Sequence, residues 1–113
     1  VIDIDYSPDQ RFLIYSSWSD YVHMCNIHGE YELHEELNFE PDYSSCMFGI
    51  SFDPASTHIL AGLNRGQVIL YDVHMKRVVT KAEAHEDDIN SVCFDDNANV
   101  FFTGSDDTQI KVW

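Results

Sequence analysis

One pattern recurs along this chain: a short apolar strand, a polar turn, and a second strand of similar length. Three copies span residues 12–26, 59–72 and 101–113. Their second strands reach Cys25, Tyr71 and Trp113, so the copies are offset by 46 and then 42 residues. A unit that repeats in this way buries its apolar faces mainly against its neighbours. The repeat therefore limits the chain to a series of similar small sheets packed side by side.

A period of roughly 40 to 45 residues with about four strands per unit is typical of the blades of a β-propeller. No stretch sustains apolar residues at helical spacing, so we predict an all-β fold of antiparallel four-stranded blades. The units fall at about 1–39, 47–82 and 85–113, with 31–39 and 77–81 as expected outer strands. A propeller closes with typically about 4 to 8 blades. We therefore expect a fragment cut at both ends, with an incomplete third unit, that is marginal or prone to aggregate alone.

The chain carries 20 acidic against 6 basic side chains, for a net charge of −14. Nucleic acids and anionic membranes require basic patches, so we expect neither as a partner and look for neutral or basic proteins instead. Part of the charge lies in the connection between the first two units: Glu30, Glu32, Glu35, Glu36, Glu40 and Asp42. This connection is interpreted as a solvated loop, with a docking site for a basic peptide as the alternative.

Cysteine usage indicates the compartment. Cys25, Cys46 and Cys93 are odd in number and form no C-x-x-C pair, which favours buried thiols in a reducing environment. No run of about 18 apolar residues is present, so we predict no membrane span.

Two dipeptide positions carry a resemblance to a known family. Ala84-His85 stands where WD-repeat proteins have Gly-His, and Trp113 stands at the first position of their Trp-Asp. The resemblance implies a structural tetrad of a His, a hydroxyl residue, an Asp and the Trp, here His85, Thr103 or Ser105, Asp107 and Trp113. In the second unit Arg65 and Tyr71 occupy the Asp and Trp positions. We therefore expect the tetrads of the first two units to be absent or rebuilt.

A hydroxyl, a His and an Asp also form the catalytic set of many hydrolases. Because no nucleophile turn of the G-x-S-x-G type is present, we interpret the set as structural and expect a binding protein rather than an enzyme. A propeller hydrolase stays open as an alternative, with its chemistry in further blades.

A metal site is a second alternative for the histidines. His23, His28 and His34, and the run 85–88, do not place two imidazoles and a third ligand on one strand face. Asp106-Asp107 lacks the spaced ligands of a calcium loop. We expect no metal and no cofactor.

Within the WD-repeat family, residues 16–30 and 85–92 are similar to stretches of a substrate receptor of the cullin-4 RING ubiquitin ligase. These receptors carry an adaptor-binding box, which the following residues match: Phe101, Phe102, Asp107, Ile110, Val112 and Trp113. In these receptors the box continues with an Asp and an Arg, at positions after the one that Trp113 matches. The resemblance implies a receptor that binds the cullin-4 adaptor and presents a protein for ubiquitination by partner enzymes. A WD-repeat scaffold without a ligase, in chromatin or signalling, is the alternative.

Some residues at the loops form a candidate partner surface: Trp18, Asp20, Tyr21, Glu86, Asp87 and Asp88. Aromatic side chains dominate interface hot spots, although Trp18, Tyr21, Tyr43 and Phe48 could equally pack between blades. The resemblance implies a stress-responsive basic-zipper transcription factor as substrate, and residence in the nucleus and cytoplasm.

Overall fold

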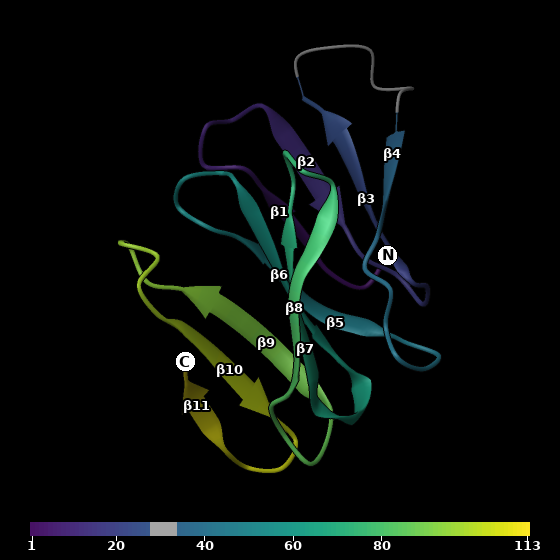
Figure 1. Cartoon of the computed structure of the whole chain (residues 1–113), viewed down its shortest axis with the longest axis vertical. Coiled ribbons are helices and arrows are strands. Elements are labelled where there is room, and N and C mark those ends of the chain that lie inside the picture. The colour runs from purple at the N-terminus through teal and green to yellow at the C-terminus, as the bar shows by residue number, and fades with distance from the viewer. Residues whose placement is uncertain (28–33) are drawn as a thin grey trace.

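The computed structural model describes residues 1–27 and 34–113, which form three antiparallel sheets (Figure 1). The first sheet contains β1 (Ile4–Tyr6), β2 (Phe12–Tyr15), β3 (Tyr21–Asn26) and β4 (His34–Asn38). The second contains β5 (Met47–Phe52), β6 (His58–Leu63), β7 (Gln67–Asp72) and β8 (Arg77–Glu83). The third contains β9 (Ile89–Phe94), β10 (Phe101–Ser105) and β11 (Ile110–Val112). The predicted all-β architecture of antiparallel four-stranded units, with the third incomplete, is confirmed.

The strands differ from the expected bounds at the outer edges. Of the first outer strand, predicted over 31–39, the structure describes β4 over His34–Asn38, and residues 31–33 of the prediction lie outside the described residues. The second outer strand extends to Glu83, two residues further than expected. The turn between β6 and β7 is a short 3-10 helix, η1 (Asn64–Gly66). Within the described ranges, no helix is long and apolar enough to cross a membrane.

The turn between the first two strands of each sheet has the same construction. The first residues of the three turns are Ser7, Asp53 and Asp95. The N–H of each donates to the carbonyl of the residue five positions later, at 2.8, 3.0 and 3.1 Å respectively. The side chain of that first residue accepts the N–H of the residue five positions on, which begins the next strand in the first two turns and directly precedes it in the third. The fourth residue of each turn has a positive φ of 58–64°. Short polar side chains favour such turns because they bond to nearby backbone. The shared geometry is the structural form of the sequence repeat.

The sheets pack through their first strands, with β5 against both β1 and β9. The second strand β6 also contacts β9, and Gly62 on β6 permits this approach, because a Cβ there would lie 2.4 Å from Ile89 Cγ2. A buried apolar core spans the first and second sheets and contains Ile14, Met47 and Ile69. A second cluster around Leu60 and Ile89 joins the second sheet to the third.

Carboxylates of the first sheet satisfy the edge of the second. Asp3 Oδ2 and Asp5 Oδ2 each accept a backbone N–H of β5, from Ile50 and Phe52, both at 3.0 Å. Ser16 Oγ also donates to Met47 O at 2.9 Å. Backbone groups at a sheet edge need such partners when they are buried, so these bonds fix the position of one sheet against the next.

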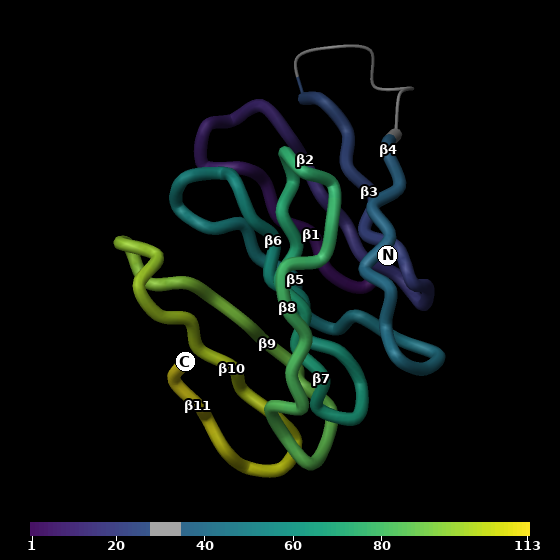
Figure 2. Tube along the Cα trace, in the orientation of Figure 1, coloured from purple at the N-terminus to yellow at the C-terminus, as the bar shows by residue number. Residues whose placement is uncertain are grey.

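The loops gather at two ends of the sheets (Figure 2). The turns 7–10, 53–57 and 95–99, in purple, teal and yellow-green, lie at the upper left. We call this the turn end. The opposite end, termed the loop rim, comprises 16–20, 41–46, 64–66, 84–88 and 105–109.

Candidate protein interface

His85 lies in the segment between β8 and β9 and is hydrogen-bonded through both ring nitrogens. Nδ1 lies 2.8 Å from Asp107 Oδ2, and Nε2 lies 2.6 Å from Thr103 Oγ1. Trp113 Nε1 donates to the same hydroxyl at 3.1 Å. In the neutral ring Nδ1–H donates to Asp107, and the Thr103 hydroxyl donates to Nε2 while accepting from Trp113. The buried polar groups of His85 and Thr103 therefore each have a partner.

The structure distinguishes the two hydroxyls that the sequence left open. Thr103 is the one at His85, and it is 1% exposed. Ser105 Oγ instead donates to Asp87 O at 3.1 Å and accepts the Asp107 N–H at 3.1 Å. Ser105 therefore holds the turn and the segment 85–88 together, outside the tetrad.

Asp107 is held in its charged form. Burial alone would raise the pKa of its carboxyl, but N–H donors from Gln109, His85 and Glu86 bring that pKa below its usual value. Hydrogen bonds to the ionised form of a carboxyl have this effect. The charge fixes the β10–β11 turn against the segment that enters β9.

The second unit has a different set at the same offsets. Arg65 follows Tyr43 by 22 residues, as Asp107 follows His85, and its guanidinium lies 5.0 Å from the centre of the Tyr43 ring. At the Trp position, Tyr71 stacks on Phe39 with ring centres 4.7 Å apart. A cation–π contact and a ring stack thus stand where the third unit has its hydrogen-bonded chain.

Hydrogen bonds connect the loops of the rim in sequence. Ser45 Oγ donates to Ser19 O at 3.1 Å, and Asn64 Nδ2 donates to Ser44 O at 3.3 Å. Further along, the Arg65 N–H donates to Asp88 Oδ1 at 2.9 Å. The rim is therefore one connected surface across the three sheets.

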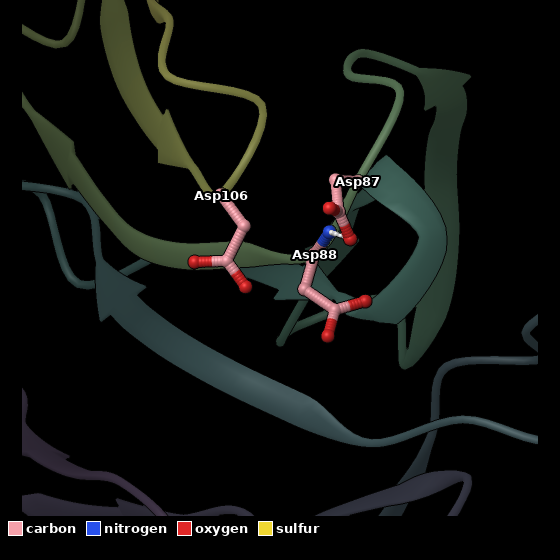
Figure 3. A group of neighbouring side chains, drawn as sticks. All are labelled: Asp87, Asp88 and Asp106. Atoms are coloured by element: carbon pink, nitrogen blue, oxygen red, sulfur yellow. Dashed lines mark hydrogen bonds between the residues drawn. The ribbon is translucent and has the colours of Figure 1, made fainter.

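Three carboxylates gather at one part of the rim (Figure 3). Oxygens of Asp87, Asp88 and Asp106 lie within 4.8 Å of one another. Asn90 Nδ2 donates to Asp106 Oδ1 at 2.6 Å, and the backbone N–H of Arg65 donates to Asp88 Oδ1. These donors reduce but do not cancel the negative charge, so the patch attracts cationic groups. Asp106 was not among the predicted surface residues, and its position next to Asp107 was the only signal for it.

The aromatic residues of the predicted surface separate into two groups. Trp18 is 79% exposed in the loop 16–20, and Tyr21 is 37% exposed at the start of β3. Tyr43 lies beneath Arg65 and Phe48 is half-buried on β5. Asp20 accepts from Ser45 Oγ at 3.4 Å, which ties the Trp18 loop to its neighbour. Trp18 and Tyr21 are thus the aromatic side chains of this group that a partner can reach.

The residues of the predicted box lie on β10, on β11 and in the turn between them, except Trp113, which directly follows β11. Phe101 and Phe102 are half-buried, and Phe101 stacks on Trp113 with ring centres 6.2 Å apart. Ile110 and Val112 are 79% and 62% exposed.

The tetrad does not have the geometry of a hydrolase site. The His85 side chain is fully buried and Thr103 is almost so, which leaves a substrate no access to the hydroxyl.

His23 stacks on Tyr15 with ring centres 5.0 Å apart. Of the other histidines weighed as metal ligands, His28 and the side chain of His34 lie outside the part of the chain that the structure describes.

The expectation of three buried thiols is wrong for Cys93, which is exposed on β9, whereas Cys25 and Cys46 are buried.

Comparison with known proteins identifies similar chains. The family described as "WD domain, G-beta repeat" matches residues 76–113. The LEC14B protein of Lithospermum erythrorhizon is 33% identical over the whole chain, which covers 27% of that protein. The DDB1- and CUL4-associated factor 11 homolog of Caenorhabditis elegans is 31% identical over the whole chain, and factor 10 of Mus musculus is 30% identical over 80% of it. The chain covers 21% and 16% of those two proteins. It thus spans about a quarter or less of these relatives.

Proposed function

We propose, on the premise that this chain is part of a WD-repeat protein, that it acts as a substrate receptor of a cullin-4 RING ubiquitin ligase. The observation that carries the proposal is the third sheet, where β10, β11 and the turn between them hold the box residues Phe101, Phe102, Asp107, Ile110 and Val112. The names of similar proteins, DDB1- and CUL4-associated factors, support the same assignment. The chain is a protein-interaction domain, and the chemistry of ubiquitin transfer belongs to partner enzymes.

The proposed receptor has two contact regions. The box on β10 and β11 binds the adaptor DDB1, and the loop rim binds the substrate. Trp18 supplies an aromatic anchor on this rim, and Asp87, Asp88 and Asp106 supply negative charge. The substrate is accordingly a protein with a basic segment, for which a stress-responsive basic-zipper factor is the candidate. We expect the receptor in the nucleus and cytoplasm.

Co-purification with DDB1 tests the adaptor contact. In the full-length protein, Ile110→Lys places a charge on the box and should reduce the recovered DDB1 at least about tenfold. Val79→Lys is the matched control, because Val79 is also an exposed apolar residue on a strand, at 51%. A thermal melt of both variants excludes unfolding as the cause.

Two results would overturn the proposal. If the wild-type protein recovers no DDB1, the WD-repeat scaffold without a ligase replaces the receptor. Equal recovery with Ile110→Lys and Val79→Lys would show that β11 is not the adaptor contact.

A further inference from the structure

A pocket lies at the turn end, between the second and third sheets and away from the loop rim. Its volume is about 270 Å³, and it is lined by Asp53, Thr57, His58, Leu70, Phe94 and Ala98. The last three form an apolar wall, and Thr57 and His58 form a polar one. Drug-sized ligands occupy pockets of about 300–1,000 Å³, so this pocket is suited to a single long side chain.

The hydrogen bonds around His58 define which ring nitrogen carries the proton. Thr57 Oγ1 donates its one proton to Asp53 Oδ2 at 2.6 Å. His58 Nδ1 lies 2.8 Å from the same hydroxyl oxygen and 3.3 Å from Asp53 Oδ2. Both of these atoms are then acceptors for Nδ1, so Nδ1 is the protonated nitrogen. In the neutral ring Nε2 is therefore an acceptor.

A second acceptor faces His58 Nε2. Asp72 is the cross-strand partner of His58, and its Oδ2 lies 3.7 Å from Nε2, beyond hydrogen-bond distance. Asp72 Oδ1 accepts the N–H groups of His74 and Met75, both at 2.9 Å. The N–H of Met75 is the main reason that the pKa of Asp72 lies below its usual value, so the carboxyl is ionised.

When the His58 ring is neutral, these two acceptors leave a position for a donor between them. One nitrogen placed about 2.9 Å from each satisfies both within normal hydrogen-bond geometry. An ammonium group suits this position because it carries three donors, no acceptor and a positive charge. Leu70 and Phe94 would cover the methylene stem that leads to it.

We propose that this pocket binds a lysine side chain of a partner polypeptide, with the ammonium bridging His58 Nε2 and Asp72 Oδ2. The stem lies against Leu70 and Phe94. The chain's net charge of −14 favours a cationic partner at this end as well. The site is separate from the adaptor and substrate contacts proposed above and does not rest on them.

NMR of the His58 imidazole tests the site directly. The probe is n-butylammonium, which reproduces the lysine side chain, added to the full-length protein at constant ionic strength. The control ion, tetramethylammonium, has the same charge but no N–H donor. We expect a saturable shift of the His58 ring signals with the first ion and none with the second, and no shift of the His85 ring.

Asp72→Asn isolates the bridging carboxylate. Asn retains an oxygen for the N–H groups of His74 and Met75 but removes the charge, so the fold is kept while the apparent Kd rises at least about tenfold. The proposal fails if tetramethylammonium gives the same shift, if n-butylammonium gives none, or if the variant binds equally well. Tighter binding of n-butylguanidinium would identify arginine instead and overturn the assignment to lysine.

Discussion

Asp107 Oδ2 lies 2.8 Å from His85 Nδ1 and joins the β10–β11 turn to the segment that enters β9. The bond belongs to a chain of donors that runs from Trp113 through Thr103 and His85 to Asp107. It connects residues that are 22 positions apart in sequence and fixes the adjoining part of the loop rim. The stability of the third sheet should therefore depend on this chain more than on other polar contacts nearby.

Thr103→Val should destabilise the protein by about 1–3 kcal/mol, because it leaves the buried His85 Nε2 without its partner and removes the acceptor of Trp113 Nε1. Ser105→Ala is the matched control and should cost about 0.5–1.5 kcal/mol, since Ser105 is only half-buried. Urea unfolding of both variants measures the difference. Equal losses would show that the two hydroxyls are equivalent, contrary to the geometry.

Asp53→Asn should lower stability at neutral pH by about 1–3 kcal/mol and flatten its dependence on acid. Burial would raise the pKa of Asp53, but donors from Thr57 and His58 lower it overall. Its contribution is therefore complete above the unfolded pKa of about 3.9 and is lost as the pH falls through the lower folded value.

The measurement for Asp53 is the free energy of unfolding from pH 7 down to about pH 2. Asp96→Asn, at an exposed position in the next turn, is the control and should leave the pH 7 value nearly unchanged. A pH profile of Asp53→Asn that follows the wild type would contradict the assignment.

Gly66→Ala should destabilise the protein by more than about 3 kcal/mol. Gly66 has a φ of +84°, and a Cβ there would lie 1.9 Å from His85 O. Gly104→Ala is the contrasting variant, because a Cβ at that position meets no atom within 4 Å. Thermal unfolding compares the two, and a mild effect at Gly66 would mean that the segment at His85 can move away.

Much of the fold follows from local signals in the sequence. The turns at Asp53 and Asp95 have short acidic side chains where the backbone needs an acceptor, and the strands between them are apolar. The sequence could not show whether Thr103 or Ser105 bonds to His85, because residues two apart share one face of a regular strand. A register shift between Gly104 and Ser105 breaks that alternation and turns the two hydroxyls to different partners.

The rebuilt set of the second unit could not be specified in advance either. The sequence showed that Arg65 and Tyr71 depart from the third unit's pattern, but it did not show that Arg65 lies over Tyr43. A cation–π contact has no fixed spacing in sequence, so only the packing of the loops brings the pair together.

By itself the sequence determined the repeat and the all-β class, because turn chemistry and strand periodicity act over a few residues. Its resemblance to WD-repeat proteins supplied the residues from which the tetrad is drawn. The tertiary structure decided that Thr103 bonds to His85, that hydrogen bonds connect the loops into one rim, and that His58 Nε2 faces Asp72 Oδ2. Each of these depends on side-chain direction and strand register, which are set when the sheets pack against one another.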